Sequence, residues 1–526
     1  MRNSRGKEEI IYQIYPKSFY DSDGDGMGDL KGITKKLDYL KKLGVTVLWI
    51  CPVYASPMDD NGYDISDYYS INPMFGTMDD MDNLIREAGM RDLKVMMDLV
   101  LNHTSDEHEW FLQAIKNPES KYRDYYIFRT SNSGCPPSNL RSVFGGSVWE
   151  PVPGTEEYYF HSFSRKQPDL NWENQELRYE LYDMIRWWIK KGIAGFRVDA
   201  VNFIKKELDV FRAEPDGRDG LASCFPYTRN VRGINAFLKE LRKEVFEPCQ
   251  CITVSEAVDV PYSEIGDYIG EQGCFSMMFD FHYTNFDLEG SDEKWHKRKN
   301  WTVEEFRELL FESQEEIQKI GWPGLFIENH DQPRAVNKFF PAKEDQTYEA
   351  ATVLAGMYFF LRGTPFIYQG QELGTKNVWK DSIESFDDIE SRGQYETALS
   401  DGCTKEEALC YVNLRSRDNA RQMIDWEEAG RQEDDKKSVL NFYRQMTALR
   451  KQEPCLVRGR FIPRRDYAGD IVAYERNDGF TRILVLCSFS KKPHEIRETG
   501  GEVLLCNQPA EAGILKPFQV IVLKWG

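Results

Sequence analysis

Residues 30–50, LKGITKKLDYLKKLGVTVLWI, join an amphipathic helix to a buried strand. The leucines and the isoleucine of the first part recur every three or four residues, which predicts a helix with one apolar face. Gly44 ends this helix, because glycine readily takes the left-handed backbone conformation of a helix C-terminus. The unbroken apolar run Val45–Ile50 predicts a strand that is buried on both faces, as in parallel sheets.

The same order of helix and strand recurs along the chain without sequence identity. Eight short apolar runs qualify as strands, and six of them clearly follow a helical pattern; the runs are Ile10–Tyr15, Val45–Ile50, Val95–Val100, Gly195–Val198, Ile252–Val254, Met277–Phe281, Leu325–Ile327 and Phe366–Tyr368. Eight such units predict an α/β fold, the (β/α)₈ TIM barrel. The alternative is an open doubly wound sheet, which would need a G-x-G-x-x-G turn after an early strand, and none lies there.

Two segments depart from the repeat. The connection after the third strand, residues 104–171, is rich in Pro, Gly, Ser and aromatic residues and is too long for an ordinary loop. After residue 455 the helical pattern gives way to short β-type runs. We therefore expect a barrel formed by residues 1–103 and 172–455, an inserted subdomain at 104–171, and a C-terminal antiparallel β-sandwich domain at 456–526.

Composition excludes several classes of partner. The formal net charge of −19 disfavours nucleic acid. The chain lacks a run of about twenty apolar residues that would span a membrane. Residues 1–9 are charged and do not resemble a secretory signal, and the eleven scattered cysteines fit reduced thiols. We expect a cytoplasmic monomer with no membrane partner.

Polar side chains gather where the predicted strands end. A single carboxylate at a strand end is more often a surface or capping residue, but the carboxyl ends of all barrel strands converge on one mouth, where catalytic groups of this fold lie. Several polar residues together therefore indicate a site; they are Asp98, Asn102, His103, Arg197, Asp199, Glu256, His330, Asp331, Gln369 and Glu372.

Asp199 and Glu256 suit the two roles of glycoside hydrolysis, a nucleophile and a general acid. Arg197 precedes Asp199 by two residues on one strand and therefore points to the same side, where it would keep Asp199 ionised. We expect Glu256 to lie near other carboxylates and away from this arginine, so that its pKa rises and it stays protonated.

Four short segments resemble the motifs of glycoside hydrolase family 13, in the order of that family. They are D-L-V-L-N-H at 98–103, G-F-R-V-D at 195–199, T-V-S-E at 253–256 and E-N-H-D at 328–331. Further segments, at 61–69, 167–171 and 330–334, resemble the oligo-1,6-glucosidase and α-glucosidase subgroup. The resemblance extends from Tyr12 to the C-terminal β runs.

The resemblance implies a retaining, exo-acting α-glucosidase. Such an enzyme hydrolyses terminal α-1,6- or α-1,4-linked glucose from short oligosaccharides through a covalent glucosyl-enzyme and needs no catalytic cofactor. Asp199 would be the nucleophile, Glu256 the acid/base and Asp331 a third carboxylate that orients sugar hydroxyls. An arginine of residues 416–421 would close the pocket with Asp60. Phe163 either lines the pocket or is only a packing residue. The implied sugar-binding residues are Asp60, Tyr63, His103, Phe163, Gln167, Arg197, His330 and Arg421.

Residues 21–29, DSDGDGMGD, place carboxylates at alternate positions around glycines, like the start of an EF-hand loop. The closing glutamate of an EF-hand is absent, since Gly32 stands there. The resemblance implies a structural Ca²⁺ in this loop, and the alternative is a solvated acidic turn. The implied ligands are Asp21, Asp23, Asp25, the carbonyl of Met27, and Asp29.

Several departures from the family pattern concern specificity. The loop after Arg421 is shortened, which predicts a wider pocket entrance. Ala200 follows the nucleophile, where α-1,6 relatives tend to carry Val and α-1,4 relatives a smaller or polar residue, and Ala257-Val258 after the acid match neither group well. We therefore expect broad specificity. Residues 287–295 lack the Arg-rich motif of sucrose isomerases, which favours hydrolysis. The alternatives are a trehalose-6-phosphate or sucrose hydrolase, a transglucosylase, and a non-catalytic partner like the amino-acid transporter heavy chains. Those heavy chains lack a complete carboxylate set and carry a membrane anchor.

Overall fold

The eight predicted strands close into a parallel barrel in a computed structural model that describes residues 5–131, 134–290, 294–498 and 500–525. Each strand lies beside its neighbour in sequence, and the eighth pairs with the first, Ile11 opposite Phe366. The predicted (β/α)₈ fold is therefore confirmed. The strands are β1 (Ile11–Ile14), β2 (Val47–Ile50), β5 (Lys94–Val100), β10 (Gly195–Asp199), β12 (Ile252–Glu256), β13 (Met277–Phe279), β14 (Pro323–Leu325) and β15 (Thr364–Tyr368). Residues 1–4, part of the charged N-terminus considered above, lie outside the described ranges.

The seventh strand begins two residues earlier than the predicted Leu325–Ile327. Proline and glycine are poor strand formers, so the predicted strand began only at the apolar residues that follow Pro323 and Gly324. The pairing of Met278 with Pro323 and of Gly324 with Thr364 overrides that preference.

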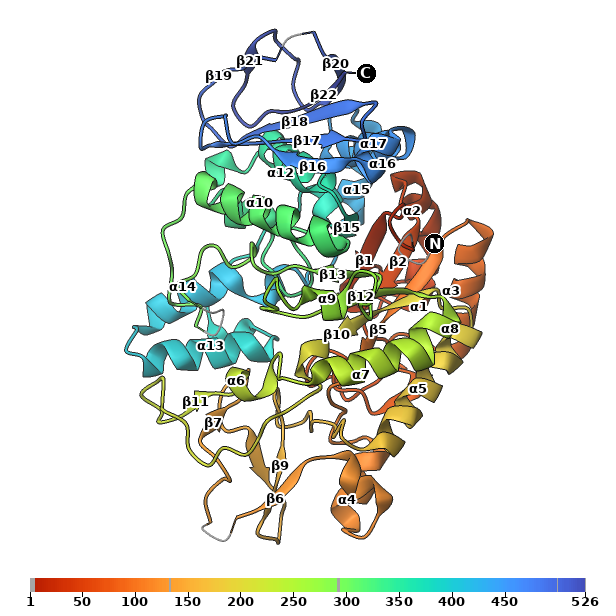
Figure 1. Ribbon diagram of the computed structural model, residues 1–526, viewed down its shortest axis with the longest axis vertical. Coiled ribbons are helices and arrows are strands. Elements are labelled where there is room, and N and C mark those ends of the chain that lie inside the picture. Colours follow the sequence, from red (N-terminus) through yellow and green to blue (C-terminus); the bar gives the residue numbers. More distant parts are fainter. Residues whose placement is uncertain (1–4, 132–133, 291–293, 499, 526) are drawn as a thin grey trace.

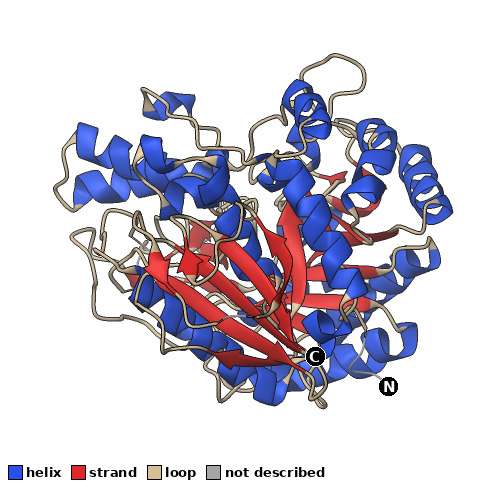
Figure 2. Ribbon diagram, turned by 90° about the horizontal axis from the view of Figure 1, so that it is seen from above, coloured by secondary structure: helices blue, strands red, loops and turns tan. Residues whose placement is uncertain are grey.

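Helices lie around the strands in the view along the long axis of the molecule (Figure 2). The first predicted helix is two helices that meet at Lys36, and Gly44 ends the second with φ 95°, as expected. No helix within the described ranges is both long and apolar enough to cross a membrane. The helices beside the barrel strands are α1 (Leu30–Lys35), α2 (Leu37–Leu43), α3 (Met78–Met90), α5 (Gln175–Lys190), α7 (Ile234–Leu241), α10 (Val303–Ile320), α12 (Tyr348–Phe359) and α16 (Val439–Gln452).

The segment inserted after β5 forms a small antiparallel sheet, β6 (Phe128–Thr130), β9 (Glu157–Phe160) and β8 (Trp149–Pro151), beside helix α4 (Glu109–Lys116) (Figure 1). Within it, β7 (Leu140–Arg141) pairs with β11 (Ala222–Ser223). Because β11 belongs to the long connection after β10, two loops of the barrel build this region together. A helical hairpin, α13 (Ile389–Ser400) and α14 (Lys405–Arg415), follows β15 and was not anticipated from the sequence.

The C-terminal part is a five-stranded antiparallel sheet that lies against α12. Arg476 fastens it to the barrel: the guanidinium is fully buried and donates to the carbonyls of Phe360 and Leu361 at the end of α12. A two-stranded pair, β19 (His494–Glu495) and β21 (Ile514–Leu515), contributes Leu515 to the core of this sheet. The five strands are β16 (Arg460–Pro463), β17 (Ile471–Asn477), β18 (Arg482–Ser488), β22 (Val520–Trp525) and β20 (Glu502–Cys506).

Candidate active site

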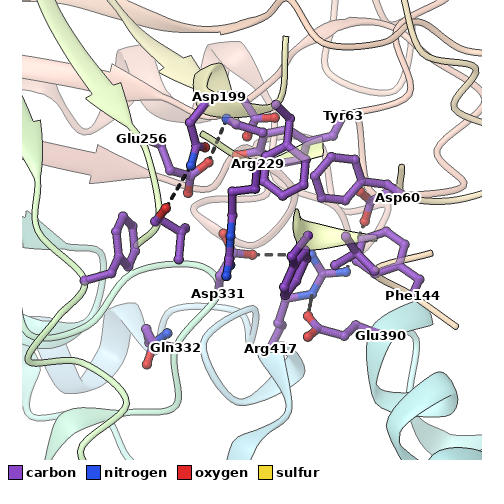
Figure 3. A pocket seen from close by; sticks show the side chains of 18 of the residues that line it. Asp60, Tyr63, Phe144, Asp199, Arg229, Glu256, Asp331, Gln332, Glu390 and Arg417 are labelled. Atoms are coloured by element: carbon purple, nitrogen blue, oxygen red, sulfur yellow. Dashed lines mark hydrogen bonds and ion pairs between the residues drawn. The ribbon is translucent and has the colours of Figure 1, made fainter. Parts of the chain in front are cut away.

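The end of β10 positions Asp199 at the barrel mouth. Ala200 follows in the left-handed conformation, with φ 39°, which costs a non-glycine residue about 1 kcal/mol or more. The turn directs the N–H of Ala200 to Oε2 of Glu256 at 3.0 Å. The end of β10 is thereby tied to the end of β12, so that Asp199 and Glu256 lie side by side in the pocket (Figure 3).

Arg197 binds three carboxylates beneath the pocket. Its Nη1 donates to Asp98 at 2.5 Å and to Asp199 at 2.6 Å, and its Nη2 contacts Oε1 of Glu256. The predicted pairing with Asp199 is therefore present. The expectation that Glu256 lies away from the arginine is wrong, because Arg197 is opposite Val254 in the sheet and its long side chain reaches over β12.

The charge state of Asp199 differs from the expectation as well. Burial raises the pKa of Asp199 well above its usual value; Arg197 opposes this effect, and the neighbouring charge of Glu256 adds to it. Arg197 therefore does not keep Asp199 fully ionised by itself. The negative charge of Glu256 beside it disfavours the ionised form of Asp199.

Asp331 follows β14 and faces the pair across the pocket (Figure 3). It accepts hydrogen bonds from Arg421 at 2.8 Å and from Arg417 at 3.4 Å, and it lies 2.9 Å from Nε2 of His330. Burial alone would raise the pKa of Asp331, but His330 and the two arginines hold it well below the usual value. Asp331 is therefore an ionised carboxylate in the wall of the pocket.

The predicted sugar-binding residues fall into two groups. Asp60, Tyr63, His103 and Phe163 line the cavity together with the three carboxylates. Gln167, Arg197, His330 and Arg421 lie directly behind this wall and hold it in place; Gln167, for example, is fully buried and donates to Asp60 at 3.1 Å. The structure thus brings all eleven predicted site residues to one place.

His103 is neutral in this arrangement. Burial lowers the pKa of its imidazole to about 4. Its Nε2 lies 3.1 Å from the amide nitrogen of Gln167, and the ring meets Phe163 edge to face, with centroids 5.4 Å apart. Phe163 therefore both packs on a site residue and lines the cavity.

Arg417 closes the end of the pocket opposite Asp199 and Glu256 (Figure 3). Its guanidinium pairs with Asp60 at 3.1 Å and with Asp388 at 2.6 Å, and it lies 5.3 Å from the Phe144 ring. The sequence located an arginine within residues 416–421, and the structure brings both arginines of that segment to Asp331. Arg417, however, is the one that lines the cavity.

Most of the aromatic wall was missed in the sequence, because these residues lie in the connections that follow the barrel strands and belong to no motif. Residues 422–425 alone join Arg421 to helix α15 (Trp426–Asp434). Residues 291–293, part of the segment 287–295 considered above, lie outside the described ranges. The wall encloses a cavity of about 190 Å³, and the aromatic residues not foreseen in it are Phe144, Phe203, Phe225, Phe281 and Trp295.

The acidic loop near the N-terminus gathers three of its predicted ligands. Asp21, Asp23 and Asp29 place carboxylate oxygens within 4.8 Å of one another. Hydrogen bonds from the backbone of Gly24 and Gly26 lower the pKa of Asp21, so this group is ionised. Asp25 lies outside the group of three and accepts the N–H of Met27 instead, at 2.8 Å.

The profile of the alpha-amylase catalytic domain matches residues 13–459. The chain belongs to the alpha-amylase family. This alpha-amylase-family chain is 39% identical to the probable oligo-1,6-glucosidase 3 of Bacillus subtilis over 564 residues, which cover 100% of both chains. It is 37% identical to the trehalose-6-phosphate hydrolase of B. subtilis over 98% of each. The crystal structure of isomaltulose synthase from Klebsiella sp. LX3 superposes with a TM-score of 0.92, at 35% identity over 99% of each chain. The predicted family and the prediction of a glycoside hydrolase are confirmed.

Proposed function

We propose that the protein is a retaining, exo-acting α-glucosidase that releases terminal α-linked glucose from short oligosaccharides. The observation that carries this proposal is the binding of Asp199 and Glu256 to one guanidinium at the mouth of the barrel. Retaining enzymes hold their two carboxyl groups about 5 Å apart, whereas inverting enzymes leave roughly 6.5–9.5 Å for a water molecule. Contacts with a single arginine favour the shorter separation.

In the proposed reaction, Asp199 attacks the anomeric carbon while Glu256 gives its proton to the glycosidic oxygen, which leaves with the aglycone. A water molecule then attacks the covalent glucosyl-enzyme and passes a proton to Glu256, so that glucose is released and Asp199 is free again. The reaction requires Asp199 as the carboxylate and Glu256 as the carboxylic acid. The side chains alone perform this chemistry, and no catalytic cofactor takes part.

The opposite end of the pocket supports exo action. Asp60 and Arg417 form an ion pair in the cavity wall, and in this proposal they limit the cavity to one sugar unit, so that only a chain end enters. The ionised Asp331 accepts hydrogen bonds from sugar hydroxyls, and these strengthen as positive charge develops on the ring in the transition state. Tyr63 offers an aromatic face for stacking in the same cavity.

For the linkage we propose broad specificity for α-1,6 and α-1,4 bonds, since small residues, Ala200 and Val258, line the cavity beside the reacting pair. Trehalose-6-phosphate hydrolysis is a second candidate, because Arg229 and Arg415 also line the cavity. Each of these arginines already has a carboxylate partner: Arg229 pairs with Asp259 at 2.7 Å, and Arg415 with Asp287 at 2.9 Å. Their charges are therefore largely compensated, which disfavours a phosphate-specific site.

A substrate panel tests the proposal: isomaltose, maltose, sucrose, trehalose 6-phosphate and a nitrophenyl α-glucoside. We expect glucose release from isomaltose, maltose and the nitrophenyl glucoside at comparable kcat/KM. Activity confined to trehalose 6-phosphate would favour the second candidate, and no glucose from any of the five would contradict the function. A cytoplasmic location and a monomeric state stay predictions.

We also propose that Asp21, Asp23 and Asp29 hold a structural Ca²⁺, for which their clustered carboxylate oxygens are suitable ligands. A ligand present at a hundred times its Kd stabilises the folded state by about 2.7 kcal/mol. Removal of calcium with EGTA should therefore lower the melting temperature by a few degrees, and the Asp23→Asn variant should not respond. Asp381→Asn, an exposed aspartate outside the loop, is the control. An unchanged melting temperature of the wild type in EGTA would show that the loop is a solvated acidic turn without a structural metal.

A further inference from the structure

The side chain of Gln13 lies inside the barrel beneath the pocket. Gln13 belongs to β1 and is 1% exposed. It shares its side of the strand with Ile11, which is part of the apolar barrel interior. An amide in such surroundings is costly unless it is hydrogen-bonded. Its Nε2 lies 2.8 Å from Nδ1 of His330 and 3.3 Å from Sγ of Cys51.

The other ring nitrogen of His330 faces the pocket. Nε2 lies 2.9 Å from Oδ2 of Asp331 and 2.6 Å from the hydroxyl of Tyr63. An ionised carboxylate only accepts hydrogen bonds, so the proton of the ring belongs on Nε2. In the neutral ring Nδ1 is then an acceptor, and the amide N–H of Gln13 is the donor it requires.

We propose that Gln13 is a positioning residue that holds His330 as the neutral tautomer with its proton on Nε2, directed at Asp331 and at the bound glucose unit. This inference rests on the proposed function, because it assigns a state to a residue of the same site. The amide acts through His330 and does not touch the sugar. A carboxylate in its place would accept a hydrogen bond from a protonated Nδ1 and so favour the imidazolium, which takes its second proton from solvent.

Other groups near the His330 ring do not compete for Nδ1. The ring lies nearly parallel to those of Tyr63 and Tyr15, with centroids 5.5 and 6.3 Å away. Arg421 donates to the backbone carbonyl of His330 at 3.0 Å. Among the described residues, Gln13 alone is hydrogen-bonded to Nδ1. The titratable and charged groups around the ring are Asp331, Asp98, Cys51, Tyr15, Tyr63, Arg197, Arg417 and Arg421.

Three variants of the full chain test this role: Gln13→Glu, Gln13→Met and, as a matched control, Gln369→Met. Gln369 was grouped by sequence with the residues of the barrel mouth, but it does not line the cavity. It is an equally buried glutamine just after β15, and its amide bonds the backbone of Tyr15 and the hydroxyl of Ser18. The measurement is kcat and KM for a nitrophenyl α-glucoside from about pH 5 to pH 9, across the range in which histidine titrates. Melting temperatures show whether each variant folds.

We expect Gln13→Glu to move the acid limb of the kcat profile upward by about one pH unit, because a carboxylate beside Nδ1 favours the imidazolium over the neutral ring. Gln13→Met should lower kcat about tenfold with a smaller change in KM, since the lost interaction matters most in the transition state. Gln369→Met should keep at least half of the wild-type kcat.

An unmoved acid limb in Gln13→Glu, or equal kcat in Gln13→Met and Gln369→Met, would overturn the role of Gln13. If the Gln13 variants fail to fold, ¹⁵N spectra of the wild type with labelled histidine decide the matter, with His330 assigned by His330→Gln. A proton found on Nδ1 contradicts the inference. A wild type that releases no glucose from the panel counts against the proposed function instead.

Discussion

The Asp199→Asn variant should lose at least about a thousandfold in kcat while its fold stays intact, a barrier increase of about 4 kcal/mol. Asparagine keeps the shape of the side chain and an oxygen that accepts from Nη1 of Arg197, but an amide does not form the glucosyl ester. The measurement is kcat on isomaltose and on a nitrophenyl α-glucoside, together with the melting temperature.

The matched control for this variant is Glu372→Gln. Glu372 is also a fully buried carboxyl group near a strand end, but it accepts hydrogen bonds from Tyr12 and Tyr39 and does not line the pocket. Burial raises the pKa of Glu372, so the neutral amide resembles its native state. Glu372→Gln should keep at least half of the wild-type activity. If Asp199→Asn loses no more than this control does, the assignment of the nucleophile is wrong.

The Glu256→Ala variant should lose about a hundredfold to ten-thousandfold in kcat on isomaltose, because general acid catalysis contributes about that much. The nitrophenyl α-glucoside should be cleaved with a far smaller loss, since nitrophenolate leaves without a proton. Hydrolysis of the glucosyl-enzyme then becomes limiting.

Azide distinguishes the role of Glu256 from that of Asp199 in the same variant. A small anion fits the space left by the glutamate side chain and attacks the glucosyl-enzyme without needing a general base. We expect azide to raise the turnover of Glu256→Ala and to yield an α-glucosyl azide. A loss of equal size on both substrates, with no effect of azide, would show that Glu256 is not the acid/base.

The barrel could be predicted from sequence because its signals are local. Helical spacing before apolar runs, with stops such as Gly44, appears within about twenty residues, and parallel strands buried on both faces read as continuous apolar segments. The seventh strand was misplaced, because register with its neighbours outweighs the poor propensity of Pro323 and Gly324. The pairing of β7 with β11 joins residues from two separate connections, and no local pattern carries that information.

The predicted site followed from the same reasoning, since polar residues after parallel strands meet at one mouth. Asp199, Glu256 and Asp331 lie there together. The contact of Arg197 with Glu256 could not be foreseen, because it depends on how far a long side chain reaches over the neighbouring strand. The aromatic wall around Phe144 comes from the connections that follow the barrel strands, whose course is set by packing and carries no periodic signal.

The configuration of the glucose first released tests the account most directly. Proton NMR during the first minutes of hydrolysis of a nitrophenyl α-glucoside, which releases no second sugar, distinguishes the two anomers of glucose before mutarotation mixes them. A nucleophile and an acid/base bound to the same arginine predict two successive displacements, so α-glucose should appear first and β-glucose only later. Initial release of β-glucose would show a single displacement by water and would contradict the role of Asp199.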